Sequence, residues 1–195
     1  MSAGAWPPPW GRRALEQVLE RLNILHASAA PGLPTFAQAH GDLTGGWAAV
    51  AEDPAPFLSL GLASREWLVR ALPSLVEAEA ACPTGGEAVT HGDLRSDNIC
   101  LTSSGAKFID WPGACRSNPE LDLGAWLPSL CFEGGPLPED LLPNAPQVAA
   151  WVCGYFAARA GLPVIPDAPF VRRVQREQLT TALPWVSRAL KLGEF

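Results

Sequence analysis

The chain has 195 residues, enough for one domain with a sizeable core, and 48% of them are hydrophobic, which excludes a disordered composition. Its formal net charge of −6 argues against nucleic-acid binding, because the phosphates of nucleic acids require a basic face. The amino terminus lacks an apolar signal core, and no apolar run of roughly 18 residues occurs, so neither a secretory signal nor a membrane span is expected.

The cysteines and histidines also exclude several kinds of site. The five cysteines show no CxxC spacing, which argues against a disulfide framework or a structural zinc site and favours a reducing, cytoplasmic environment. The three histidines form no HExxH motif and no cluster typical of a metal centre.

The first half of the chain is predicted to be helical with irregular connections. After a Pro-rich lead-in over residues 1–10, apolar residues recur at three- and four-residue steps over residues 15–25, which predicts a helix. Residues 35–60 are punctuated by Gly and Pro and are expected to be irregular, with one or two helical turns. A second helix is expected after Ser64, a suitable N-cap, and Pro73 is expected to kink or split it.

The second half predicts a short hairpin followed by helices. The short runs 99–101 and 107–109 flank the turn sequence TSSG and are typical of a β-hairpin. Three further helices are expected, over residues 121–131, 147–160 and 170–191. The last residues, 191–195, are assigned no function. The predicted fold is mainly α with one short β-hairpin, in a single domain over residues 1–195.

The tetrapeptide HGDL occurs twice, and only the second copy has a context that suggests chemistry. In that copy Asp93 is followed five positions later by Asn98, and Asp110 follows twelve positions further, at the end of the second hairpin strand. The first copy has no such hairpin or acid after it. We therefore interpret His40, Gly41 and Asp42 as a loop and expect them to lie away from the candidate site.

The spacing of the second copy suits phosphoryl transfer. That reaction needs a carboxylate to orient the acceptor hydroxyl and receive its proton, and oxygen ligands to hold Mg²⁺ on the nucleotide phosphates. A hairpin brings Asn98 and Asp110 together although they are twelve residues apart, and Asp93 then stands across the gap.

The segment HGDLRSDNICLTSSGAKFIDWPGACRSNPELDLGAW, residues 91–126, resembles the catalytic core of the aminoglycoside phosphotransferase family, relatives of the protein kinases. That family's pattern is H-G-D-x-x-x-x-N, then I-D-W or I-D-F/L, then a helix start P-x-x-D-L-A, where this chain has Gly124 in place of Ala. The flanking helices fit as well. The resemblance therefore covers most of the chain and implies the helical C-terminal lobe of a kinase-like fold.

The resemblance assigns roles residue by residue. It implies that Asp93 is the catalytic base and that Asn98 and Asp110 are the Mg²⁺ ligands. It implies that His91 structures the loop, and that Asp122 braces the loop through backbone N–H groups from the first turn of a helix.

Other residues receive weaker assignments from the same resemblance. Arg95 is either a phosphate contact or a surface residue, and Cys100 and Ile109 would lie under the nucleotide. The cofactors implied are Mg²⁺ and ATP, and the partner is a small molecule that accepts the phosphate on a hydroxyl. The acidic residues Glu133, Glu139 and Asp140 could line a pocket for a cationic substrate, but exposed charge is the favoured interpretation.

The residues before His91 lack features that kinases carry in an N-terminal β-lobe. They contain no G-x-G-x-x-G sequence and no lysine, since the only lysines are Lys107 and Lys191. We therefore expect that the N-terminal lobe is absent, that the chain is a truncated or split form, and that a separate N-lobe or a second chain completes it. Apolar surface is then expected to be exposed near residues 99–101 and the tryptophans of the Pro-rich start.

Two functional hypotheses follow from these observations. The first is an ATP-dependent phosphotransferase acting on a small molecule, with weak or no activity in the isolated chain. The alternative is a non-catalytic kinase-like module that binds a small molecule or a partner protein. The intact set of Asp93, Asn98 and Asp110 favours the enzyme, whereas the missing lobe favours the module.

Overall fold

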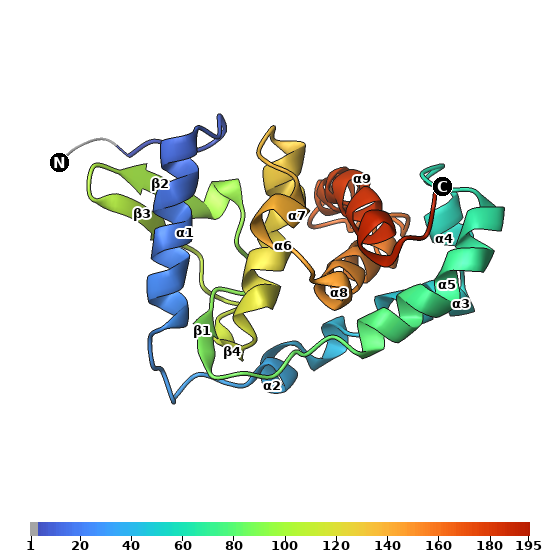
Figure 1. Cartoon of the computed structure of the whole chain (residues 1–195), viewed down its shortest axis with the longest axis horizontal. Helices are drawn as coiled ribbons and strands as arrows, with labels where there is room; N and C mark the ends of the chain where they lie inside the picture. The colour runs from blue at the N-terminus through green and yellow to red at the C-terminus, as the bar shows by residue number, and fades with distance from the viewer. Residues whose placement is uncertain (1–3) are drawn as a thin grey trace. The chain divides into compact units, whose positions relative to one another are not determined.

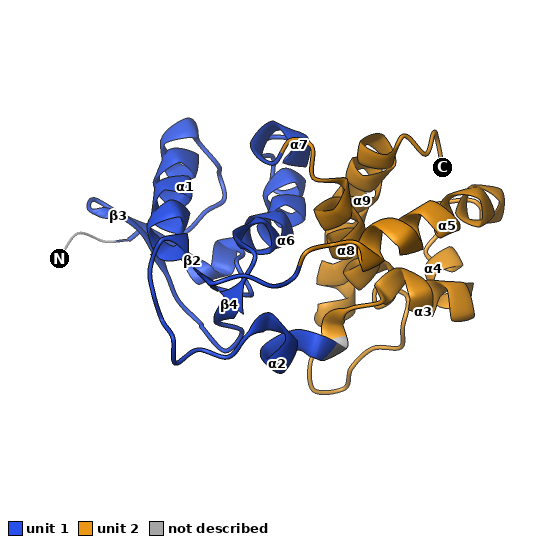
Figure 2. Ribbon diagram, turned by 60° about the horizontal axis from the view of Figure 1, so that its bottom comes forward, with its two compact units in different colours: residues 1–41, 84–142 blue, residues 42–83, 143–195 orange. Residues whose placement is uncertain are grey.

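A computed structural model describes residues 4–195 of the chain, apart from the side chain of Asp42. These residues form two compact units, each assembled from two separate stretches of chain (Figure 2). Unit 1 contains the described residues up to Gly41 together with residues 84–142, and unit 2 contains residues 42–83 and 143–195. The single domain expected over residues 1–195 thus has two compact parts.

Unit 1 contains the helices α1 (Arg12–His26), α2 (Phe36–His40), α6 (Pro119–Phe132) and α7 (Pro138–Leu141). It also contains a 3₁₀ turn, η2 (Ser96–Asn98). A second 3₁₀ turn, η1 (Gly41–Leu43), spans the sequence boundary between unit 1 and unit 2. Helix α1 packs against both the β-hairpin and the strand before the HGD sequence (Figure 1). Helix α6 starts with two favourable features: the Asn118 side chain caps it by accepting the Glu120 N–H, and Pro119 occupies its first turn.

Unit 1 also holds two small antiparallel sheets. Strands β2 (Ile99–Thr102) and β3 (Gly105–Phe108) form the predicted hairpin, with Ile99 opposite Phe108. The second sheet, β1 (Ala88–Thr90) paired with β4 (Cys115–Ser117), was not predicted. Its strands are too short to show a two-residue pattern, and 25 residues separate the paired Thr90 and Cys115.

Unit 2 is helical in its described residues, with α3 (Gly46–Glu52), α4 (Ala55–Leu58), α5 (Arg65–Ala80), α8 (Pro146–Ala157) and α9 (Val171–Leu190). Helix α8 is apolar on all sides and packs against α3, α5 and α9, which explains why most of its residues are buried. The three helices expected after the hairpin correspond to α6, α8 and α9. None of the helices in the described residues combines the length and apolar character needed to cross a membrane.

Two expectations about local structure were wrong at least in part. Pro73 was expected to kink or split α5, and it does not split the helix, which runs from its expected Ser64 cap to Ala80. Pro73 has no backbone N–H, so the carbonyl oxygen of Val69 lacks its usual helical hydrogen bond. Val69 lies on an exposed face of the helix, where water can donate to that carbonyl instead. The interpretation of His40 as loop was also wrong, because His40 ends α2, a helix started by a capping box between Thr35 and Gln38.

A buried acid organises the start of α3 in unit 2. Glu79 of α5 accepts the N–H groups of Gly46 at 2.9 Å and Trp47 at 2.8 Å. Gly154 of α8 lies so close that a Cβ at that position would meet the Glu79 carboxylate. Burial raises the pKa of Glu79 above its ordinary value, although the two N–H donors and Arg159 act in the opposite direction.

Candidate active site

The loop of residues 91–95, the HGD loop, follows β1 and is fixed from within by His91. The imidazole of His91 is fully buried, with Nε2 lying 2.9 Å from the carbonyl oxygen of Ile109. Because a carbonyl can only accept, Nε2 carries the proton, and Nδ1 is free to accept the N–H of Asp93 at 3.3 Å. Through these two hydrogen bonds, the side chain of His91 links the backbone of Asp93 to that of Ile109, the residue before Asp110.

A second contact fixes the HGD loop from α6. Asp122, which is 3% exposed in the first turn of that helix, accepts the His91 N–H on Oδ2 and the Gly92 N–H on Oδ1, both at 2.9 Å. These are the hydrogen bonds to backbone N–H groups that the family resemblance implies for Asp122. Gly92 has a φ of +80°, and a Cβ there would meet the carbonyl oxygen of Gly113, so this position requires glycine.

Asn98 joins the HGD loop to the hairpin. Its Nδ2 donates to the carbonyl oxygen of Asp93 at 2.8 Å and lies 3.4 Å from the Asp93 carboxylate. The N–H of Ile109 donates to the carbonyl oxygen of Asn98 at 3.0 Å, which extends the hairpin pairing by one position. Hydrogen bonds therefore connect the three segments that carry Asp93, Asn98 and Asp110.

Asp110 has a backbone conformation that few residues adopt. Its φ is +62°, in the left-handed region, where Asp and Asn are better tolerated than other residues with a Cβ. Its carboxylate is exposed, directly after Ile109. Asp110 and Asn98 each carry side-chain oxygen, the kind of ligand that suits Mg²⁺. In the described residues no three His, Cys, Asp or Glu side chains gather as a metal cage, and Mg²⁺ usually takes its other ligands from phosphates and water.

Arg95 faces acidic side chains. Its Nε lies 3.6 Å from Oδ1 of Asp93, and its Nη2 lies 3.0 Å from Oδ2 of Asp97. The Nε atom is buried and has no hydrogen-bond partner among the described residues. Arg95 therefore forms ion pairs with the acidic residues two positions before and two positions after it.

The two residues expected under the nucleotide differ in exposure. Ile109 is 44% exposed, whereas Cys100 on β2 is half-buried and lies so close to Gly4 that a Cβ there would meet its sulfur. The N-terminal segment covers this strand, because Ala5 forms a two-hydrogen-bond bridge with Leu101 at 2.8 Å. Apolar surface was expected to be exposed near residues 99–101 and at the tryptophans of the Pro-rich start. Ile99 is fully buried, whereas Trp6 is 51% exposed.

Sequence reasoning missed two histidines that contact this region. His26, the last residue of α1, places Nε2 at 3.1 Å from Oδ2 of Asp122. His40 places Nε2 at 2.8 Å from the carbonyl oxygen of Gly113, the residue that packs against Gly92. The partners are 96 and 73 residues apart, and the only sequence signal was the position of His26 at the end of an apolar helical pattern.

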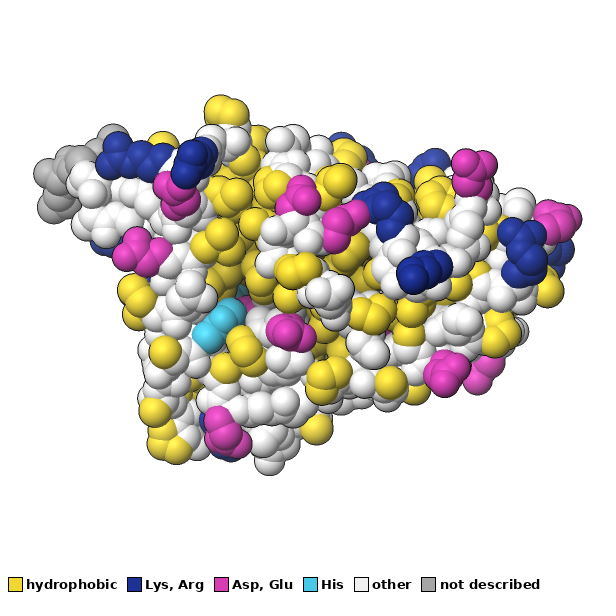
Figure 3. All heavy atoms as spheres, in the orientation of Figure 1, with side chains coloured by type: hydrophobic (Ala, Val, Ile, Leu, Met, Phe, Trp, Pro, Cys, Tyr) yellow, Lys and Arg dark blue, Asp and Glu magenta, His cyan; other side chains and the backbone are white. Residues whose placement is uncertain are grey.

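Glu133 was expected as exposed charge, but it is half-buried and engaged. Its carboxylate accepts Nε1–H of Trp10 at 2.7 Å and the hydroxyl of Ser96 at 2.6 Å. Glu133 thus connects the Pro-rich start to the turn that carries Asn98. Elsewhere on the face shown in Figure 3, charged side chains are dispersed among polar and hydrophobic ones.

Comparisons with known proteins gave a family match and a structural match. The sequence matches the phosphotransferase enzyme family over residues 5–160. The structure is similar to that of an ethanolamine kinase from Plasmodium vivax, with a TM-score of 0.54 and 15% sequence identity. That match covers 97% of this chain but 66% of the kinase chain, so this chain spans slightly less than two thirds of its length. The comparison with curated proteins gives no match.

The two findings establish different things. At 15% identity, the structural likeness shows the fold alone, which is protein-kinase-like. The family match covers well over half of the chain and includes the HGD loop, the hairpin and the start of α6. The chain belongs to the phosphotransferase enzyme family.

Proposed function

We propose that this chain transfers the γ-phosphate of ATP to a hydroxyl group of a small molecule, with Mg²⁺ as the required ion. The observation that carries the proposal is the link between the HGD loop and the hairpin. His91 and Asn98 tie the backbone of Asp93 to the two strands that lead to Asp110. Phosphoryl transfer depends on such positioning, because the protein contributes little covalent chemistry.

Asp93 is the proposed base. Its side chain is 45% exposed, so an acceptor hydroxyl can reach the carboxylate, while its N–H and carbonyl oxygen are both hydrogen-bonded. A fixed backbone with an accessible carboxylate suits a group that orients a hydroxyl and receives its proton. Arg95, 3.6 Å from the same carboxylate, is the proposed phosphate contact and would exchange its acidic neighbours for phosphate oxygens.

Asn98 and Asp110 are the proposed ligands of Mg²⁺. The Nδ2 atom of Asn98 already donates to Asp93, which leaves Oδ1 as the atom suited to a cation. The exposed Asp110 carboxylate supplies the negative oxygen. When bound, the ion neutralises charge on the nucleotide phosphates. Ile109, which is exposed beside Asp110, and Cys100 are the proposed floor under the nucleotide.

The acceptor class is proposed from chemistry and from the similar structure. Because that structure is an ethanolamine kinase, small amino alcohols are the first acceptors to test, and aminoglycosides are the second. The net charge of −6 is compatible with a cationic acceptor.

A second candidate function is a kinase-like module that binds without transferring phosphate. One observation favours it: no lysine precedes Lys107, so the residues before the HGD loop offer no lysine side chain for the nucleotide phosphates. An N-terminal lobe or a second chain would supply that charge under the first proposal.

Calorimetric titration with Mg·ATP, followed by an ADP-release assay with ethanolamine, choline and an aminoglycoside panel, separates the two candidates. The enzyme proposal predicts Mg²⁺-dependent nucleotide binding and acceptor-stimulated ADP release that Asp93→Asn abolishes. Binding without any such release, with all acceptors, would favour the module. Absence of Mg·ATP binding at millimolar concentration would reject the enzyme proposal for this chain alone.

A further inference from the structure

The carboxylate of Asp122 carries three contacts on two oxygens. Oδ1 accepts the Gly92 N–H, while Oδ2 accepts the His91 N–H and lies 3.1 Å from Nε2 of His26. The Asp122 side chain is 1% exposed, so water cannot readily replace a lost partner. Each of these contacts therefore helps to determine how the carboxylate is oriented.

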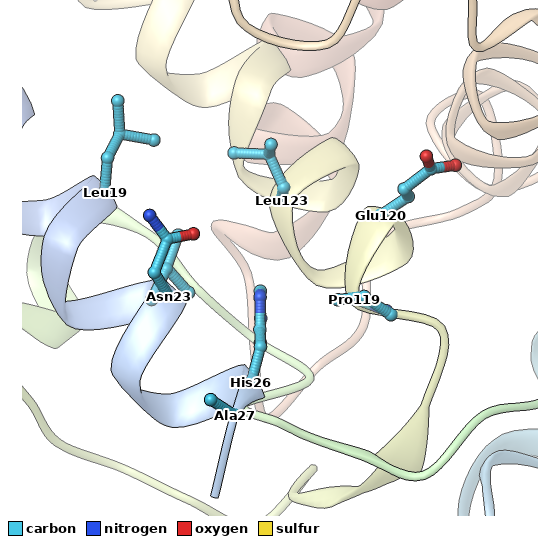
Figure 4. A pocket seen from close by; sticks show the side chains of 8 residues that line it. Leu19, Asn23, His26, Ala27, Pro119, Glu120 and Leu123 are labelled. Atoms are coloured by element: carbon cyan, nitrogen blue, oxygen red, sulfur yellow. The ribbon is translucent and has the colours of Figure 1, made fainter.

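His26 differs from the other two partners because it comes from another helix and contacts Asp122 through its side chain. It ends α1, and its side chain is 14% exposed at the edge of a hollow of about 440 Å³ between α1 and the start of α6. Figure 4 shows His26 with Asn23 on α1, facing the Pro119–Glu120 end of α6. Because the Asp122 carboxylate accepts, Nε2 of His26 is the donor.

We infer that His26 is a positioning residue for the HGD loop, acting through Asp122. Without the His26 donor, Asp122 can rotate about its side-chain bonds, and its two acceptor oxygens no longer define the directions of the His91 and Gly92 N–H groups. The next residue along the loop is Asp93, so a small rotation of this backbone displaces the proposed base. Displacements of about 1 Å at a reacting group are enough to slow phosphoryl transfer severely.

The contact geometry provides two variants of His26, one that retains the hydrogen-bond donor to Asp122 and one that removes it. In a histidine, Nε2 lies at the far side of the ring, and the amide nitrogen of glutamine occupies a similar position. The amide nitrogen of asparagine instead corresponds to Nδ1, which does not face Asp122. His26→Gln therefore retains the donor and His26→Asn removes it, although both replace the ring by a neutral amide. Asn23→Ala is the matched control, because Asn23 is exposed and lines the same hollow, and the hydrogen bonds of the Asp122 carboxylate among the described residues go to His26, His91 and Gly92.

The first readout needs no substrate, so it is independent of the proposed function. Amide hydrogen exchange at His91 and Gly92, measured by NMR on the full chain, reports directly on the two bonds to Asp122. His26→Asn should speed exchange at both amides by roughly tenfold or more relative to wild type, beyond any change in the global exchange rate. His26→Gln and Asn23→Ala should leave both rates close to wild type.

The second readout rests on the proposed function and uses Mg·ATP with ethanolamine as the probe, or the best acceptor of the panel. His26→Asn should lower kcat by about 10- to 100-fold, the usual cost of losing a supporting hydrogen bond, with KM for ATP little changed. His26→Gln should recover most of kcat. Equal exchange rates in His26→Asn and wild type would overturn the inference, as would equal losses in His26→Gln and His26→Asn. If wild type shows no turnover at all, the proposed function fails while the exchange result still decides the role of His26.

Discussion

The side chain of Asn98 donates a hydrogen bond to the backbone carbonyl oxygen of Asp93, five positions earlier in the sequence, at 2.8 Å. The residue proposed to hold the metal ion therefore also fixes the backbone of the proposed base. A change at Asn98 alters both at once, and for this reason substitutions at Asp93 and Asp110 are the cleaner tests.

Replacing Asp93 by Asn should lower kcat for phosphate transfer by about 10²- to 10⁴-fold, because the amide cannot receive the hydroxyl proton. The substitution keeps the shape of the side chain and the backbone bonds to His91 and Asn98. ADP release in the presence of acceptor is the measurement. Asp97→Asn is the control, because Asp97 is an exposed acid that contacts the same Arg95. Similar losses in the two variants would count against the role of Asp93.

Replacing Asp110 by Asn should weaken Mg·ATP binding by about tenfold, or ~1.4 kcal/mol in binding free energy, because a negative ligand oxygen is lost. Asparagine is chosen because it tolerates the φ of +62° at this position, so backbone strain does not confuse the result. Calorimetric titration of each variant with ATP, with and without Mg²⁺, is the measurement. A loss of the same size without Mg²⁺ would show that Asp110 does not act through the metal ion.

Replacing Gly92 by Ala should destabilise the protein and disturb the HGD loop, because a Cβ at this position meets the carbonyl oxygen of Gly113. Gly134→Ala separates this clash from simple strain, since Gly134 has a similar φ of +87° but open space around it. The control should cost about 1–2 kcal/mol of unfolding free energy, and Gly92→Ala distinctly more. Urea unfolding of both variants tests this, and equal costs would contradict it.

The raised pKa of Glu79 predicts a pH-dependent stability. The folded state binds the Glu79 proton more tightly than the unfolded state does, so this group's contribution is complete below the unfolded pKa. The contribution is lost as the pH rises through the folded pKa, in a window that starts near the ordinary glutamate pKa of 4.5. Unfolding free energy should therefore decline less with rising pH in Glu79→Gln than in wild type.

Urea unfolding of wild type and Glu79→Gln between about pH 4 and pH 7 gives the difference in slope. Glu77→Gln controls for the loss of one acid from the same helix, since Glu77 is exposed. Parallel stability curves for wild type and Glu79→Gln would show that Glu79 takes up no extra proton on folding.

Local sequence signals predicted the elements that depend on near neighbours. The main helices follow from apolar periodicity and the hairpin from two short runs on either side of a turn, whereas Asp122 was identified only through the family resemblance. Features that depend on distant pairings could not be predicted in this way. The β1–β4 sheet joins strands 25 residues apart at Thr90 and Cys115, and His26 meets Asp122 across 96 residues. The sequence of a short strand, or of a single histidine and its neighbours, does not indicate which distant residue it will pair with.

The interleaved composition of unit 2 imposes an order on its assembly during synthesis. Trp47 donates its indole N–H to the carbonyl oxygen of Ala150, 103 residues later, and Glu79 lies against Gly154. At ~5–20 residues per second, a ribosome needs on the order of 5–20 s to deliver those partners after Trp47 emerges. All of unit 1 is translated before α8 begins. In a nascent chain the apolar faces of α3 and α5 therefore stay uncovered until α8 has been synthesised, and chaperones can bind them during that time.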